Sequence, residues 1–151
     1  FVKISDLIEP TMKNIEDIAG SKENVLGVPS GFADLDKKIG GFRPGQFVVI
    51  AARPAMGKTS FALNMAFNAA VNFDKKVGIF SLEMDAEEII MRMISSASEV
   101  PMENILKGYG MDEKKILRIS QVAEVLSQKE IYIDDMCSNT MMEIRAKSRR
   151  L

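Results

Sequence analysis

The sequence has a single cysteine, Cys137, and neither histidine nor tryptophan. One thiol cannot build a disulfide framework, and the usual zinc sites need several cysteine or histidine ligands, so both kinds of site are excluded. No apolar run approaches the ~20 residues that a membrane-spanning helix requires, so a membrane partner is not expected. A chain with so little cysteine suits a reducing compartment, and the cytoplasm is its expected location.

The chain has 20 lysines and arginines and 21 aspartates and glutamates, so its formal net charge is −1 and neither sign dominates. Proteins that coat duplex DNA are usually more basic. Any nucleic-acid contact must therefore be local, shared between subunits, or made by residues outside this chain. The 151 residues suffice for one domain with a core. Because the chain starts at Phe1 and stops in a basic run at Leu151, we expect it to be a piece of a longer protein.

Residues 51–60 are the most informative stretch and read Ala-Ala-Arg-Pro-Ala-Met-Gly-Lys-Thr-Ser. An apolar run at 47–50 precedes them and an amphipathic segment at 61–73 follows. A buried strand, a tight loop ending in Gly-Lys-Thr and a helix are the context of a phosphate-binding loop. The backbone N–H groups of such a loop form an anion site at a helix N-terminus. Lys58 would then reach the β- and γ-phosphates of a nucleotide, and the Thr59 hydroxyl would bind Mg²⁺.

One position departs from the usual pattern, which has glycine five residues before Gly57, where this chain has Ala52. Alanine lacks only the freedom to adopt positive φ, so a loop that enters in the β region tolerates it. The alternative is a Gly-Lys-Thr loop at the start of an ordinary helix. The predicted strand and helix on either side favour the phosphate-binding interpretation.

The remaining pattern alternates strands and helices, which predicts an α/β domain with a mainly parallel sheet. The predicted strands cover residues 46–52, 77–82 and 131–133. The predicted helices cover about 11–19 after a turn at Pro10, a short segment at 32–39 and the segment 61–73. Further helices are predicted to begin after Asp85, Asp112 and Thr140. Residues 101–110 are expected to be irregular. The 25 positions from Lys58 to Glu83 leave room for one helix and one strand, hence a β–α–β unit.

Residues 1–24 are predicted to be a linker that carries an amphipathic helix. Apolar side chains recur at spacings of three and four from Ile4 to Ile18, which is one face of a helix. An apolar stripe of this kind is normally buried against another surface. That surface belongs either to the chain's own domain or to a neighbouring subunit.

Carboxylates follow two of the predicted strands, where ligands bind in open α/β sheets. Glu83 could orient and deprotonate the water that attacks a γ-phosphate, or it could be a surface or capping glutamate. Asp134 has the place of a Mg²⁺ ligand, although any buried strand that ends in a turn gives the same short pattern.

Two arginines are further candidates. Arg53 could bind phosphate or form an intersubunit salt bridge, and Arg92 could stack its planar guanidinium on a nucleobase. An exposed or ion-paired surface role is the alternative for each. The basic residues of the last predicted helix indicate an exposed charged face more than a nucleic-acid site.

Four motifs occur in order along the chain. They read Gly-Val-Pro-Ser-Gly-Phe-x-x-Leu-Asp from residue 27, Ala-Ala-Arg-Pro-x-Met-Gly-Lys-Thr from residue 51, Phe-Ser-Leu-Glu-Met from residue 80, and Ile-Tyr-Ile-Asp-Asp from residue 131. Together with Glu-Ile-Arg-Ala-Lys-Ser-Arg-Arg-Leu at 143–151, they resemble the bacterial replicative DNA helicases of the DnaB type. The resemblance runs from the linker to the last residue, and the loop of this family commonly starts with Ala.

The resemblance implies a RecA-like P-loop NTPase that uses ATP and Mg²⁺ and works as a hexameric ring around single-stranded DNA. Such an enzyme couples ATP hydrolysis at subunit boundaries to translocation and duplex unwinding. Residues 1–24 would be the linker with its docking helix on the adjacent subunit, and residues 25–151 the N-terminal half of the ATPase domain. A primase and a helicase loader are candidate partners. The DNA-contacting loops, the metal-side aspartate and the arginine finger would lie beyond Leu151.

The resemblance also implies roles for single residues. Lys58 and Glu83 would be catalytic, Thr59 would bind the metal, and Asp134 becomes a structural strand end. The cofactor-binding residues would be Arg53, Pro54, Ala55, Met56, Gly57, Lys58, Thr59, Ser60 and, near the base, Arg92. With half of an active site, residues 1–151 alone should hydrolyse ATP poorly. The alternatives are another RecA-like ATPase, such as a recombinase paralogue or a clock-type ATPase, and a nucleotide-controlled assembly module without catalysis.

Overall fold

The computed structural model describes residues 1–20, 27–136 and 140–151. Their contacts divide into two compact units, Phe1–Phe47 and Val48–Leu151. The boundary expected between residues 24 and 25 lies outside the described residues, so it stays a prediction.

The first unit opens with helix α1, Ser5–Gly20, which is longer than predicted. We expected a turn at Pro10 and a helix from Thr11, but the helix includes Pro10 and already begins at Ser5. Proline lacks an N–H group and so removes one helical hydrogen bond. The Thr11 hydroxyl donates to the Leu7 carbonyl at 2.6 Å in the same turn. The apolar stripe on both sides of Pro10 therefore continues on one helix.

No side chain of α1 is buried among the described residues. Six apolar side chains of the stripe are exposed: Ile4, Leu7, Ile8, Met12, Ile15 and Ile18. The expected amphipathic helix is therefore present, and its apolar face is exposed among the described residues of its own unit.

The Gly-Val-Pro-Ser-Gly-Phe-x-x-Leu-Asp motif folds around the carboxylate of Asp36 on helix α2, Ala33–Ile39. This buried carboxylate accepts hydrogen bonds from the backbone N–H groups of Ser30 at 2.8 Å and Gly31 at 3.2 Å. A β-carbon at Gly27 would come within 2.3 Å of the Phe42 carbonyl oxygen. Glycine is required there because the two backbone segments approach so closely.

The second unit is built on two parallel strands, β1 (Val77–Phe80) and β2 (Ile131–Asp134). The register places Val77 opposite Ile131 and Phe80 opposite Asp134. Successive side chains of a strand point to opposite faces. Ile79 and Ile133 therefore share the face that packs on the hydrophobic core.

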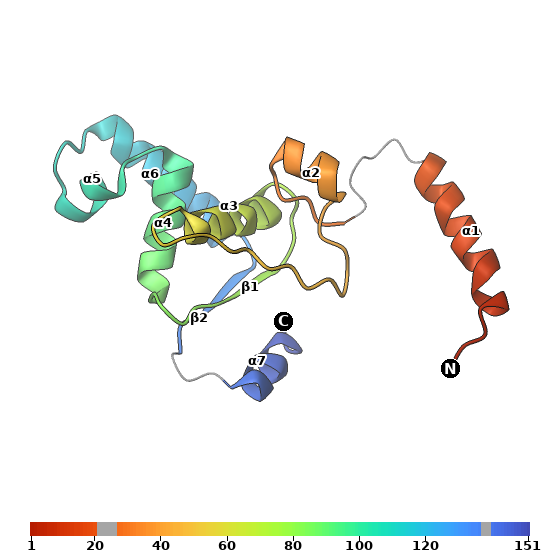
Figure 1. The fold of residues 1–151 in the computed structure, drawn as a ribbon. Coiled ribbons are helices and arrows are strands. Elements are labelled where there is room, and N and C mark those ends of the chain that lie inside the picture. Colours follow the sequence, from red (N-terminus) through yellow and green to blue (C-terminus); the bar gives the residue numbers. More distant parts are fainter. Residues whose placement is uncertain (21–26, 137–139) are drawn as a thin grey trace. The chain divides into compact units, whose positions relative to one another are not determined.

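Helices cover both faces of this small sheet (Figure 1). On one face lie α3 (Lys58–Val71), α4 (Ala86–Ser98) and α6 (Glu113–Ser127). On the other face α7 (Met141–Ser148) is followed by Leu151, which lies over Gly78 of β1. The core consists of Leu63, Ile89 and Met93, with Ala66, Ile79, Met84, Leu126 and Ile133 packed against it.

The predicted helix starts of this unit are confirmed. The carboxylate of Asp85 accepts from the Glu88 N–H at 2.7 Å, and that of Asp112 accepts from the Lys115 N–H at 2.8 Å. Thr140 begins α7 with the reciprocal bonds of a capping box. A side-chain oxygen at the N-cap satisfies one of the free N–H groups of the first turn.

Two predictions about the strands are wrong. Residues 46–52 form no strand, and the Phe47 side chain is 91% exposed. A strand needs a neighbour for its N–H and C=O groups, and in the described part of the chain this segment has none. The parallel pair is instead β1 with β2, so the β–α–β unit expected around α3 does not form.

The stretch 101–110, expected to be irregular, contains helix α5 (Met102–Lys107). Pro101 lies at its start and Gly108, at φ 65°, ends it, which is the usual placement of proline and glycine around a helix. On α6 the side chains of Ile119, Val122, Ala123 and Leu126 are half-buried, and that of Ile116 is exposed.

Candidate active site

The Gly-Lys-Thr loop leads directly into α3, which begins at Lys58. Gly57, at φ 80°, is the N-cap residue, and no side chain caps the helix. The first N–H groups of a helix have no acceptor within it. An uncapped start with a glycine in the left-handed region therefore leaves these N–H groups available to an anion.

The backbone of the loop also accounts for Ala52. The described non-glycine residues with positive φ are Ala55, Asp74 and Glu99. Ala52 is not among them, so alanine costs nothing at that position. Sequence reasoning missed the strained position, which is Ala55 at φ 63°. The Met56 N–H donates to the Arg53 carbonyl at 3.3 Å and closes the turn around it.

A hollow of about 340 Å³ lies beside this loop. It is lined by Ala52, Arg53, Pro54, Ala55, Met56, Lys58 and Glu83. We call it the loop hollow. It brings Glu83 to the Gly-Lys-Thr loop, together with Lys58 and Arg53.

Glu83 reaches the loop hollow on a short turn, Ser81–Met84, that follows β1. The Ser81 N–H donates to the Asp134 carbonyl at 2.8 Å, which extends the β1–β2 ladder by one bond. The Ser81 hydroxyl donates to the Met84 carbonyl at 2.7 Å and accepts from the Met84 N–H at 3.1 Å. Sequence reasoning missed Ser81. The signal that could have identified it is the residue type, because serine side chains in turns often bond backbone groups a few residues away.

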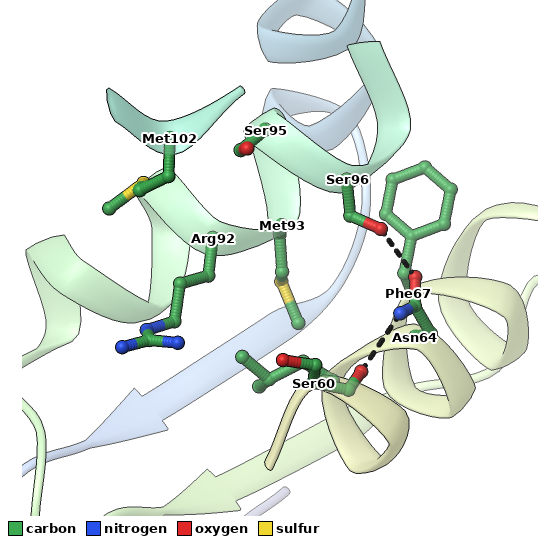
Figure 2. Close-up of a pocket in the computed structure, with 9 residues that line it drawn as sticks. Ser60, Asn64, Phe67, Arg92, Met93, Ser95, Ser96 and Met102 are labelled. Atoms are coloured by element: carbon green, nitrogen blue, oxygen red, sulfur yellow. Dashed lines mark hydrogen bonds between the residues drawn. The ribbon is translucent and has the colours of Figure 1, made fainter. Parts of the chain in front are cut away.

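Arg92 lies in a different pocket, of about 210 Å³, between α3 and α4 (Figure 2). Its Nε and Nη2 atoms donate to Oε1 of Glu88 at 2.9 and 2.6 Å. Ser60, the last predicted residue of the loop, also lines this second pocket. The structure therefore groups Arg92 with Ser60 and does not place it in the loop hollow.

A chain of hydrogen bonds crosses that second pocket from α4 to the first turn of α3 (Figure 2). The Ser96 hydroxyl donates to Oδ1 of Asn64 at 2.8 Å, and Nδ2 of Asn64 donates to the Ser60 carbonyl at 2.9 Å. These bonds hold the start of α3, and with it Lys58 and Thr59, at a fixed place against α4.

The Asp134 carboxylate forms its contacts on the face of the sheet away from the core. Its Oδ2 atom pairs with the Lys147 ammonium of α7, and its Oδ1 atom accepts from the Met136 N–H at 3.2 Å. This agrees with a structural strand end. Within residues 1–20, 27–136 and 140–151, no group of three or more histidine, cysteine, aspartate or glutamate side chains could hold a metal ion.

The resolved pKa shifts belong to exposed pairs away from the loop hollow. The Thr140 N–H and then its hydroxyl hold the pKa of Glu143 below its usual value. Hydrogen bonding to Lys129 lowers the pKa of Asp74, and hydrogen bonding to Glu130 raises the pKa of Lys76. These shifts report on helix capping and surface ion pairs.

Among the helices that the structure describes, none has the length and apolar character to cross a bilayer.

Comparison with known proteins matches residues 27–151 to the DnaB-like helicase C terminal domain. The replicative DNA helicase DnaC of Bacillus subtilis (strain 168) is 40% identical over 151 residues, which is 100% of this chain and 33% of that protein. The replicative DNA helicase DnaB of Haemophilus influenzae is 42% identical over 152 residues, covering 98% of this chain and 32% of that protein. The chain thus spans about a third of the length of these relatives.

Solved structures agree. The ATPase domain of G40P superposes with a TM-score of 0.85 at 35% identity, over 94% of this chain and 50% of that one. A DnaB-like replicative helicase, solved in a study of its interactions with primase, gives a TM-score of 0.84 at 34% identity, over 94% and 34%. The predicted fold class, a RecA-like α/β domain, is confirmed. The family match and these likenesses together show that the chain belongs to the DnaB-like helicase C-terminal domains.

Proposed function

We propose that this chain is the nucleotide-binding half of the ATPase domain of a replicative DNA helicase. The observation that carries the proposal is the loop hollow, in which Glu83 faces a phosphate-binding loop that ends at an uncapped helix start. The family match favours a helicase over other RecA-like ATPases, because it covers residues 27–151.

The residues fit the phosphates of ATP. Lys58 supplies a positive charge, and the free N–H groups at the start of α3 supply donors for phosphate oxygens. The Thr59 hydroxyl offers one oxygen ligand to Mg²⁺, an ion that prefers oxygen ligands and usually binds through few protein groups together with phosphate and water. When bound, Mg²⁺ would offset negative charge on the phosphates.

Glu83 acts as the general base in this proposal. Its carboxylate accepts a proton from the water that attacks the γ-phosphate and orients that water in line with the leaving group. Arg53 lines the same hollow and donates to phosphate oxygens. Arg92 lines the neighbouring pocket together with Ser60, and in this proposal it contributes to binding the base.

The wider activity needs more than this chain. A net charge of −1 leaves single-stranded DNA to be bound by residues outside residues 1–151. The exposed apolar stripe of α1 docks on an adjacent subunit of a hexameric ring, and a primase and a helicase loader are candidate partners of that ring. We expect residues 1–151 alone to bind nucleotide weakly and to hydrolyse it poorly, because they span only about a third of the length of their relatives.

The test is DNA-stimulated ATP turnover and unwinding by the full-length protein, with Glu83→Gln as the variant. We expect turnover to fall by roughly 10²–10⁴-fold, the usual contribution of a general base. Glu87→Gln is the matched control, since Glu87 is an exposed residue on the first turn of α4. If Glu83→Gln keeps both activities, the assignment of the base is wrong. Nucleotide-dependent partner binding without DNA-stimulated turnover in the unmodified protein would instead favour an assembly module.

A further inference from the structure

The turn Ser81–Met84, which carries the proposed base, is closed by one of its own side chains. Leu82 and Glu83 are exposed at its tip. The Ser81 hydroxyl bonds both the N–H and the carbonyl of Met84, so a single side chain closes the turn. A hydroxyl can donate one hydrogen bond and accept others, and both capacities are used here.

Both ends of the turn are anchored in the body of the domain. The Ser81 N–H is bonded to the Asp134 carbonyl at the end of β2. The Met84 side chain packs against the core of Leu63, Ile89 and Met93. Only the two residues between the anchors project from the surface.

Asp135 adds a third anchor from a distant part of the chain. Its Oδ2 atom accepts from the Ala86 N–H at 2.9 Å, across 49 positions of sequence. Ala86 is the first residue of α4, the helix that starts just after the turn. The Asp85 carboxylate accepts from the N–H of Glu88, two residues further along, so two carboxylates hold this helix start. Negative charge is favourable at a helix N-terminus.

We propose that Ser81 and Asp135 are positioning residues that hold Glu83 against the phosphate-binding loop. This inference rests on the proposed function, because it concerns the same carboxylate. Neither residue lines the loop hollow. They act by fixing the backbone on both sides of Glu83, Ser81 within the turn and Asp135 at the following helix. A displacement of ~1 Å at a reacting group can cost about 10²-fold in rate, so the anchoring has a measurable effect.

The experiment measures kcat, KM for ATP and nucleotide affinity for Ser81→Ala and Asp135→Ala in the full-length protein. We expect kcat to fall by about 10-fold or more, with KM and nucleotide affinity unchanged, since the phosphate-binding loop is untouched. The conservative variants Ser81→Thr and Asp135→Asn should restore part of kcat, because each keeps an oxygen that can accept the hydrogen bond. Hydrogen exchange of the Met84 and Ala86 amides should quicken in the respective alanine variants.

Ser127→Ala is the matched control, since the Ser127 hydroxyl also bonds a nearby carbonyl, that of Glu124 at 2.7 Å, on the far helix α6. It should leave kcat unchanged. If Glu83→Gln abolishes turnover but both alanine variants keep the parental kcat, the positioning inference is overturned and the proposed function stands. A loss of kcat matched by an equal loss of nucleotide affinity, with no rescue by the conservative variants, also overturns it. Full turnover by Glu83→Gln would overturn the base assignment itself.

Discussion

Lys58 and Glu83 line the same hollow of about 340 Å³, although they lie on different elements and 25 positions apart in sequence. Lys58 is the first residue of α3, and Glu83 lies on the turn after β1. In the proposed function, Lys58 supplies the cation for phosphate oxygens and Glu83 the carboxylate for the attacking water.

Replacing Gly57 with alanine should weaken nucleotide binding through backbone strain. Gly57 has φ 80°, and an added β-carbon would meet nothing within 4 Å, so strain is the only direct effect. The left-handed conformation costs an L-residue roughly 1–2 kcal/mol. Gly108→Ala is the matched control, because Gly108 has φ 65° with equally open space, at the end of α5. Denaturant unfolding should show similar losses of stability for both variants, and nucleotide titration should show weaker binding for Gly57→Ala alone. Equal affinities would contradict a role for this backbone in phosphate binding.

Removing the Asp134 carboxylate should affect stability and leave metal dependence alone. Asp134 pairs with Lys147, and a partly exposed pair of this kind contributes roughly 0.2–1 kcal/mol. Asp134→Asn and Lys147→Met should therefore lower the free energy of unfolding by similar small amounts. The Mg²⁺ concentration that supports half-maximal ATP turnover should stay at the parental value. A marked rise in that concentration for Asp134→Asn alone would restore Asp134 as a metal ligand.

The stability of α7 should depend on acid pH through Glu143. The Thr140 N–H and hydroxyl hold the pKa of Glu143 below its usual range, so folding favours the ionised carboxylate. Its contribution is complete above glutamate's usual pKa of about 4.3 and is lost as pH falls through the lower pKa of the folded state. Glu143→Gln should flatten the loss of stability in this range, as followed by thermal unfolding at a series of pH values. An unchanged pH profile would show that the capping box does not form in solution.

A charge on the apolar stripe of α1 should disrupt assembly. Ile15 lies on the exposed stripe, and burying an apolar face against a partner is the expected source of docking energy. Ile15→Glu in the full-length protein should shift sedimentation from rings to smaller species. Lys13→Glu is the control, because it changes the charge more but lies on the opposite side of the helix. Intact rings with Ile15→Glu would refute docking through this face.

The sequence predicted best the features that local signals determine. The Gly-Lys-Thr loop, the caps at Asp85, Asp112 and Thr140, and the two paired strands all have signatures within a few residues. The strand expected at 46–52 was wrong because an apolar run cannot reveal whether a neighbouring strand is present to pair with it. Asp135 was missed because its bond to Ala86 joins segments 49 positions apart.

Other differences between prediction and structure arose within short segments of the chain, where the local sequence signals were opposed, weak or overlooked. Pro10 was expected to form a turn before the helix, yet it costs one hydrogen bond and the apolar stripe continues across it. The helix α5 is too short for periodicity to identify it, and only its flanking Pro101 and Gly108 indicate its ends. Arg92 was assigned to the base side, and its pairing with Glu88 on the same helix face could have been predicted from their spacing of four.

The measurement that tests the central claim most directly is single-turnover hydrolysis of ATP already bound to the full-length Glu83→Gln variant. If Glu83 is the base beside a phosphate site built from Lys58 and its loop, ATP should bind with near-parental affinity. It should then remain uncleaved over the time in which the unmodified protein converts it to ADP and phosphate. Cleavage of the bound ATP at the parental rate would contradict the account.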